Sequence, residues 1–151
     1  MTRILALAFA TGLSLGQPCP VSTQPTSNPD ESMSILVHIT HGPEHPTRAA
    51  LGFAVAAAAV QQGHKVTVFL AGDAVQLVRE GVIDQLAGLG TGKLSELVDT
   101  VVSGGGRFYL SGGSSAARGL STVDIGVPDF EMASPARLVE LALEHDRQFV
   151  Y

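Results

Sequence analysis

Residues 35–70 read ILVHITHGPEHPTRAALGFAVAAAAVQQGHKVTVFL, and this stretch predicts the fold class. The β-branched run at residues 35–40 predicts a strand. A segment of helical length follows at residues 46–62, with Pro46 in its first turn and Gly63 after its end. The run KVTVFL at residues 65–70 predicts a second strand. Strand, helix and strand joined by short connections predict a parallel βαβ unit with a right-handed crossover.

The remainder of the chain continues the alternation of strands and helices. We expect strands at residues 107–110, 123–127 and 148–151, and helices at residues 74–79, 93–102, 114–118 and 134–145. Asp73 is expected to cap the first of these helices, and Ser134, followed by Pro135, the last. The Gly-rich stretch at residues 80–92 reads as a flexible connector. The pattern predicts an α/β fold whose parallel sheet is covered on both faces.

Composition limits both the architecture and the partners. The chain has 151 residues, 45% of them hydrophobic and 15% charged, which predicts one compact domain at residues 33–151 and excludes an extended disordered protein. Because the formal net charge is −5, the protein offers no basic surface for a nucleic acid. One cysteine, Cys19, excludes an internal disulfide and a zinc site made of several cysteines.

The first 32 residues differ from the rest in composition. Residues 1–16 carry Arg3 before an apolar stretch and resemble a secretory signal, while the Pro-, Ser- and Thr-rich residues 17–32 read as a linker. The apolar stretch is shorter than the roughly 20 residues that a membrane helix needs, so no membrane anchor is expected. Alternatively, Met33 is the true start. The first reading predicts an exported or periplasmic protein, the second a cytoplasmic one.

The helix expected at residues 46–62 has two apolar faces and almost no charge after Arg48. Leu51 and Val55 lie on one face, and Phe53 and Val60 on another. Such a helix needs two apolar neighbours, and we expect the sheet to be one and a second subunit the other. The alternative is that the alanines pack closely on the sheet and one side of the helix stays exposed to solvent.

Ligands of open parallel sheets bind beyond the carboxyl ends of the strands, so the loops after Thr40, Leu70 and Leu110 are the candidate site. Arg118 can pair with a ligand carboxylate or with an acid of a neighbouring subunit. The Gly- and Ser-rich turn after Leu110 can present free amides to a small ligand. The predicted ligand-binding residues are His41, Gly42, Pro43, Ser111, Gly112, Ser114, Ser115 and Arg118.

Three imidazoles, of His38, His41 and His45, fall within eight residues and raise the possibility of a zinc site. Spacing places no fourth ligand beside them, and His38 belongs to a strand whose neighbours alternate between faces. No metal is therefore predicted, and a role for His41 as a rim residue or general acid or base fits better.

Two further motifs resemble catalytic or cofactor loops incompletely. Residues 112–116 approach a nucleophile elbow around Ser114, but Ala116 replaces the second glycine and the chain is short for such hydrolases. The glycines before Lys93 resemble a phosphate loop, but Leu94 stands where Ser or Thr should bind magnesium. Neither motif supports a hydrolase or a nucleotide cofactor, and no cofactor is predicted.

Three segments together resemble the DsrE/DsrF-like family: ILVHITHGPEHPTRAALGFAVAAAAVQQGHKVTVFLAGDAVQLV, GGGRFYLSGGSSAARGL and ASPARLVELALEHDRQFVY. The resemblance covers nearly all of residues 34–151. It implies a three-layer α/β/α fold around a five-stranded parallel sheet and assembly into trimers or hexamers. It also implies sulfur relay chemistry, in which the best-known members carry a persulfide on a cysteine just after the third strand. By position, that cysteine corresponds to Ser111.

A serine hydroxyl forms no persulfide, because the chemistry needs a thiolate. Cys19 could substitute only if residues 17–32 fold back over the pocket. The first hypothesis is therefore an oligomeric small-ligand-binding or accessory protein, linked to sulfur metabolism but without persulfide chemistry on its own side chain. The alternative is a sulfur-transfer or redox enzyme that uses Ser111, His41 or a partner's thiol. In a third reading the domain serves only assembly.

Overall fold

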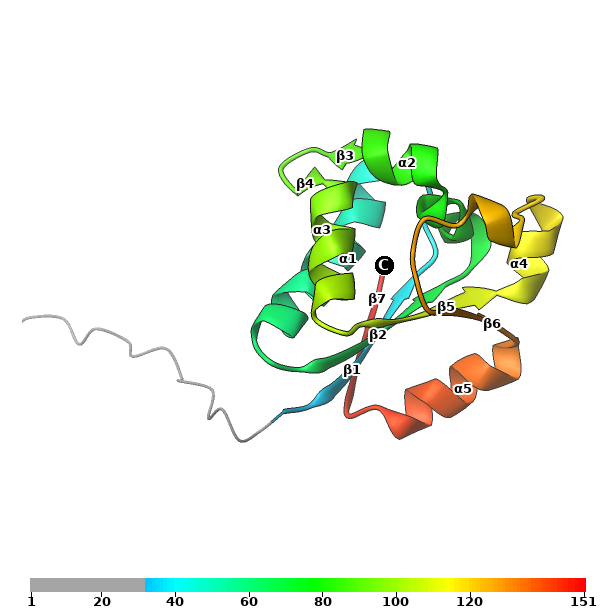
Figure 1. Ribbon diagram of the computed structural model, residues 1–151. Helices are drawn as coiled ribbons and strands as arrows, with labels where there is room; N and C mark the ends of the chain where they lie inside the picture. Colours follow the sequence, from blue (N-terminus) through cyan, green and yellow to red (C-terminus); the bar gives the residue numbers. More distant parts are fainter. Residues whose placement is uncertain (1–31) are drawn as a thin grey trace, which may run out of the picture.

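The computed structural model describes residues 32–151, which form a five-stranded parallel sheet with helices on both faces (Figure 1). The strand order is β6-β5-β2-β1-β7. The strands are β1 (Ser34–Ile39), β2 (Lys65–Leu70), β5 (Arg107–Ser111), β6 (Phe130–Ala133) and β7 (Arg147–Val150). The predicted α/β/α fold with a five-stranded parallel sheet is confirmed. The signal-like segment and the linker, up to residue 31, lie outside the described residues.

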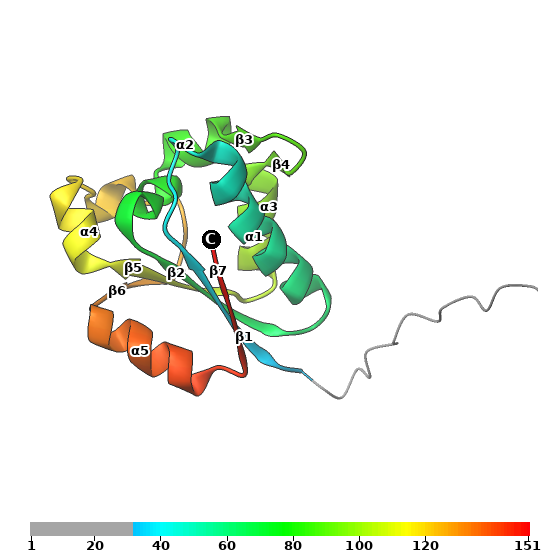
Figure 2. The same cartoon turned by 180° about the vertical axis from the view of Figure 1, so that it is seen from behind.

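Unequal numbers of helices cover the two faces of the sheet. Helices α1 (Pro46–Gln61), α2 (Glu80–Gln85) and α3 (Leu94–Ser103) lie on one face, and α5 (Pro135–Glu144) lies on the other (Figures 1 and 2). The short helix α4 (Gly112–Ala117) continues directly from β5 at the carboxyl ends of the strands. Four of these helices begin and end within two residues of their predicted bounds: α1, α3, α4 and α5.

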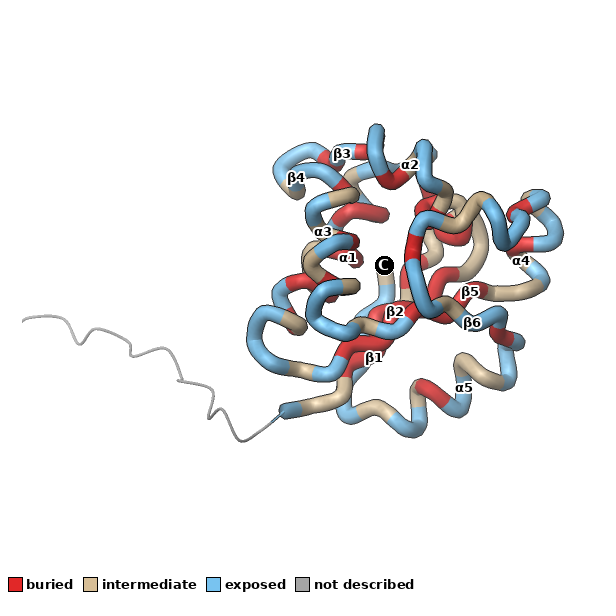
Figure 3. Tube along the Cα trace, in the orientation of Figure 1, coloured by how far each residue is buried: buried red, intermediate tan, exposed pale blue. Residues whose placement is uncertain are grey.

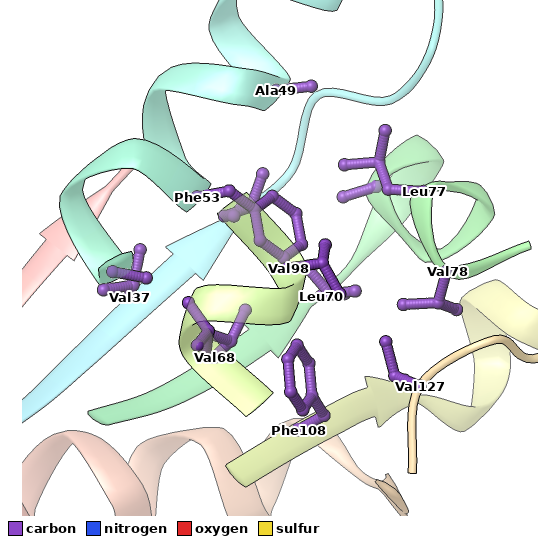
Figure 4. Close-up of a cluster of buried hydrophobic side chains, with 14 of the residues drawn as sticks. Val37, Ala49, Phe53, Val68, Leu70, Leu77, Val78, Val98, Phe108 and Val127 are labelled. Atoms are coloured by element: carbon purple, nitrogen blue, oxygen red, sulfur yellow. The ribbon is translucent and has the colours of Figure 1, made fainter. Parts of the chain in front are cut away.

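The core follows the two-residue period of the central strands. Val37, Val68 and Phe108 point toward α1 and α3 and join a large buried cluster (Figure 4). On the opposite face, Leu36 and Phe69 pack with Leu141 of α5. Each such side chain stabilises the fold by about 1.5–3 kcal/mol through burial. The two central strands β1 and β2 are accordingly buried along most of their length (Figure 3).

Helix α1 finds its second apolar neighbour within the same chain. Its Phe53 is fully buried over the sheet, and its last turn packs so closely on the end of α3 that a Cβ at Gly104 would lie 1.8 Å from Val60 Cγ1. A second subunit, which the sequence predicted as this neighbour, is therefore not needed to cover the buried faces of α1. Leu51 is 41% exposed, so part of the outer face stays uncovered in one chain.

The segment after β2 differs from its prediction. Residues 72–78 form a 3-10 helix, Gly72–Val78, instead of an α-helix beginning at Ala74. Gly72 adopts a positive φ of 59°, a conformation that favours glycine and starts the helix early. Ala71 occupies the N-cap position, and Asp73 lies in the first turn, where its carboxylate accepts a hydrogen bond from Arg118. The predicted capping role of Asp73 is wrong.

Residues 80–92 are also more ordered than the predicted connector. They contain α2 and most of a small hairpin of β3 (Ala87–Gly88) and β4 (Gly92–Lys93). Gly90 and Gly92 have positive φ, a backbone conformation that the hairpin turn requires and that glycine adopts readily.

The strand predicted at residues 123–127 is absent, and the fourth strand of the sheet lies later, at β6. Ser121 and Asp124 form a capping box that holds Thr122–Asp124 as a 3-10 helix. Val123 is 88% exposed, while Val127 reaches the core from irregular backbone. The alternation of apolar residues at 123–127 therefore predicted a strand wrongly, because the capping box holds this segment in a helical turn.

Candidate functional site

Parallel pairing brings the loops after β1, β2 and β5 to one edge of the sheet, called here the carboxyl edge. Ile39 pairs with Leu70, and Leu70 pairs with Leu110, so the three strands end at nearly the same level. The loops that begin at Thr40, Ala71 and Ser111 are consequently neighbours. This is the arrangement that the sequence predicted for the candidate site.

Side chains of α4 tie its helix to the loop after β2. The Gly72 amide donates a hydrogen bond to Ser114 Oγ at 3.0 Å. Arg118 Nε donates to Asp73 Oδ1 at 2.8 Å, and Arg118 Nη1 donates to the Ser114 carbonyl at 3.3 Å. Gly72 and Asp73 therefore belong to the site, although the sequence interpretation did not include them. The acid that pairs with Arg118 in the structure lies in its own chain, whereas the sequence suggested a ligand carboxylate or an acid of a neighbouring subunit.

Gly42 brings the loop after β1 into the same group. A Cβ at this position would lie 2.4 Å from the backbone oxygen of Asp73, so only glycine allows this close approach. The Gly42 amide donates to Glu44 Oε1 at 2.8 Å, which holds the turn. Gly42, Ser114 and Arg118 thus meet at the carboxyl edge through Gly72 and Asp73.

Ser111 ends β5 and occupies the N-cap position of α4. Its Oγ accepts a hydrogen bond from the Ser114 amide at 3.4 Å, so the hydroxyl satisfies a backbone group that the helix leaves free. Gly112 begins the helix, and an added Cβ there would meet only the Ala133 carbonyl, at 3.8 Å. Ser111 is half-buried.

Ser115, which the sequence predicts as a ligand-binding residue, is the most buried of the serines of α4. It is 2% exposed, and its Oγ has no hydrogen-bond partner among the described residues. Burying an unsatisfied hydroxyl costs about 1–3 kcal/mol. Ser115 lies on the inner side of α4 and does not belong to the exposed rim.

His41 contacts the start of α1. Arg48 Nη1 lies 3.2 Å from His41 Nε2, and the rings of His41 and His45 meet edge to face with centroids 5.4 Å apart. His41 Nδ1 lies 3.4 Å from Thr40 Oγ1. If Arg48 donates to Nε2, His41 is neutral and donates from Nδ1 to the Thr40 hydroxyl. None of these contacts joins His41 to Ser111 or Arg118.

Pro43 lies beside a separate, shallow cavity of about 350 Å³ between the loop after β1 and α2. Pro46, Val82 and Leu86 line it as well. The predicted site therefore divides into a group around Ser111 and Arg118, a group around His41, and this apolar hollow.

The three histidines of the zinc hypothesis do not converge. His38 packs its ring edge-on against Phe69, with centroids 5.6 Å apart, and its Nε2 is buried without a partner in the part of the chain that the structure describes. Burial lowers the pKa of His38, because the charged imidazolium loses its hydration. Within residues 32–151, no three side chains of the metal-binding types come together.

In residues 32–151, no helix is both long and apolar enough to cross a membrane.

Comparison with known proteins identifies the scaffold. The crystal structure of the ychN protein from E. coli superposes with a TM-score of 0.66, at 18% identity, over 80% of this chain and all of that one. At this identity the likeness shows the fold alone. No curated protein matches the sequence. The model of the DsrE/DsrF-like family, however, matches residues 33–151, and the chain therefore belongs to this family, which is associated with sulfur relay.

Proposed function

We propose that the protein is a small-ligand-binding or accessory member of its family, which acts in sulfur metabolism without carrying sulfur on a side chain of its folded domain. The single observation that carries this proposal is Ser111. It ends β5, where the family's cysteine is expected, and its hydroxyl caps α4. A hydroxyl at this position orders the helix start as a cap but cannot act as a thiolate.

The polar surface at the carboxyl edge supports binding of a small polar ligand or a partner segment. Beside Ser111, the exposed Gly113 leaves the backbone accessible, since an added Cβ there would meet nothing within 4 Å. The half-buried guanidinium of Arg118 is held in one orientation by Asp73 and Ser114. A fixed hydroxyl and a fixed guanidinium recognise a ligand with less entropy loss than mobile groups do.

Self-association into a trimer or hexamer is part of the same proposal. Large apolar side chains are exposed on α1 and on β7, the strand at one edge of the sheet, where Phe149 is 42% exposed. Exposed apolar side chains also occur on α5, at Val139 and Leu143. DsrE-like proteins typically form oligomers, and surfaces of this kind are what such contacts bury. Native mass spectrometry of the full chain should give three or six copies.

The domain is proposed to comprise residues 33–151, the same range that the family model matches. Whether residues 1–16 act as an export signal or Met33 starts the protein decides between an exported and a cytoplasmic location. The intact mass of protein purified from its own host distinguishes these two forms.

The function is tested by sulfur loading. The full chain and its Cys19→Ser variant are incubated with a low-molecular-weight persulfide, the excess is removed, and the intact mass is measured before and after reduction. In such a transfer, a protein thiolate attacks the outer sulfur of the donor, the donor's S–S bond breaks, and the donor leaves as a thiolate. We expect the Cys19→Ser variant to gain no reducible sulfur.

Two results would oppose the proposal. Stoichiometric sulfur on the Cys19→Ser variant would show a carrier group other than a thiol. Sulfur on Cys19 of the unmodified chain that passes on to an acceptor thiol would show that the N-terminal segment supplies the missing chemistry.

A further inference from the structure

A cavity of about 660 Å³ opens at the amino ends of the strands, the opposite edge of the sheet from the site described above. Its volume lies within the range of roughly 300–1,000 Å³ typical of small-molecule sites. The strands β2 and β5, helix α5 and the residue after it contribute its polar walls. The side chains that matter for recognition are those of Lys65, Thr67, Arg107, Tyr109, Arg137 and His145.

Positive charge is concentrated at this cavity, although the whole chain has a net charge of −5. Lys65, Arg107 and Arg137 line it, against the single carboxylate of Glu144. Arg137 neutralises that carboxylate through an ion pair of 3.0 Å and also lies over the Tyr109 ring. In residues 32–151, neither Lys65 nor Arg107 takes part in an ion pair.

The sheet register places these two cations beside each other. Arg107 pairs with Thr67 across β2 and β5, and Lys65 precedes Thr67 by two residues, so all three lie on the α5 face. Strand spacing and rise put the Cα atoms of Lys65 and Arg107 roughly 8 Å apart along a diagonal. An ammonium and a guanidinium at this separation can both reach one small anion.

The wall beside the cations is fixed by hydrogen bonds. Thr67 is 7% exposed, and its Oγ1 lies 2.9 Å from His145 Nε2. His145 Nδ1 lies 2.6 Å from the Leu141 carbonyl, which only accepts, so Nδ1 carries a proton and donates to it. With a neutral ring, Nε2 accepts from the Thr67 hydroxyl. This chain of hydrogen bonds joins β2 to the end of α5 and does not involve Lys65 or Arg107.

A neighbouring cavity of about 530 Å³ shares Arg107 but has the opposite charge character. Asp129 and Glu131 line it, and neither carboxylate lies within ion-pair distance of Arg107. These acids compete for Arg107 electrostatically, which favours an anion on the side where Lys65 adds a second positive charge.

We propose that the cavity at the amino edge binds a tetrahedral oxyanion, either free or as the phosphoryl or sulfonyl group of a small metabolite. Arg107 contacts two of its oxygens in a bidentate arrangement, and Lys65 contacts a third. The remaining volume accommodates the rest of an organic ligand beside Thr67 and Tyr109. The proposal does not depend on the function proposed for the carboxyl edge.

Titration of the full chain with inorganic phosphate, at an ionic strength held constant with sodium chloride, tests this site. Binding is followed by the backbone amide resonances of Lys65, Thr67 and Arg107. We expect saturable binding that weakens about tenfold in Arg107→Gln and in Lys65→Gln, since each removes one charge-assisted contact. Arg147→Gln is the matched control, because Arg147 starts β7 at the same edge and does not line the cavity.

A second arm repeats the titration with glycerol phosphate. Tighter binding of the ester than of inorganic phosphate identifies a metabolite's phosphoryl group as the ligand, and equal binding identifies the free ion. Either result supports the shared chemistry. The proposal is overturned if the resonances show no saturable shift, or if Arg147→Gln weakens binding as much as Arg107→Gln does. Ser111→Ala should leave phosphate binding unchanged, which separates this site from the carboxyl edge.

Discussion

The polar side chains at the two edges of the sheet differ in whether they have partners within the chain. At the carboxyl edge, Gly72 donates to Ser114, Arg118 binds Asp73, and Ser111 caps α4, so the loops hold one another. At the amino edge, β2, β5 and α5 line a cavity of about 660 Å³, and Lys65 and Arg107 have no ion-pair partner in the described part of the chain.

This difference shows that the family's site position and the open polar cavity are separate features of the fold. The loops after parallel strands normally provide the ligand site. Here the hydroxyl and guanidinium groups of these loops make contacts within the chain, and these contacts stabilise α4 and its neighbours. Substitutions at the carboxyl edge should therefore lower stability in addition to any effect on binding there, whereas substitutions of Lys65 and Arg107 at the amino edge should change mainly the affinity for phosphate.

The largest expected effect follows from Gly42→Ala. The new Cβ would lie 2.4 Å from the backbone oxygen of Asp73, so the two loops must separate. We expect the free energy of unfolding to fall by about 1–3 kcal/mol, measured by chemical denaturation. Gly113→Ala is the control, because its Cβ meets nothing within 4 Å, and it should not destabilise the protein. Equal effects of the two changes would show that the loops are not in close contact.

A smaller effect is expected for the pair of Asp73 and Arg118. Their side chains are partly exposed, so solvent screens the interaction. A double-mutant cycle with Asp73→Asn and Arg118→Gln should give a coupling energy between about 0.2 and 1 kcal/mol. A coupling energy of zero would mean that this ion pair does not join α4 to the loop after β2.

The pH dependence of stability sharpens the account of His38, which lies near the carboxyl end of β1. Burial lowers its folded-state pKa below the ordinary histidine value of 6.5, so the unfolded chain binds a proton more readily. The free energy of unfolding should therefore decrease as the pH falls through 6.5 toward the folded-state pKa. His38→Leu should flatten this decrease, whereas the same change at the exposed His45 should not. An unchanged slope in His38→Leu would contradict the buried environment.

The smallest change in stability is expected at the amino edge. Arg107 is exposed and makes no ion pair within residues 32–151, so Arg107→Gln should alter the free energy of unfolding by less than about 0.5 kcal/mol. A loss comparable to that of Gly42→Ala would show that the cation is structural and would remove the contrast between the edges.

The sequence predicted those features that depend on local pattern. The β-branched runs that became β1 and β2 and the capped helix after Ser134 have strong periodic signals, and the structure confirms them. The strand expected at residues 123–127 failed because a capping box around Ser121 is a stronger local determinant than three alternating apolar residues.

Prediction of the sites was limited by contacts between distant residues. Gly42, Ser114 and Arg118 were named because they follow predicted strands, but the role of Asp73 depends on a partner 45 residues away. No sequence motif indicated the cavity at the amino edge. Lys65, Arg107 and Arg137 are far apart in the chain, and only the parallel register and the packing of α5 bring them together.

The most direct test of the central claim is to restore the thiol at the end of β5. In the Cys19→Ser background, Ser111→Cys places a single cysteine at the start of α4, where the helix amides favour a thiolate. After incubation with a persulfide donor, the intact mass should increase by one reducible sulfur per chain. If the variant folds but stays unloaded, Ser111 does not occupy a sulfur-carrying position, and the account is contradicted.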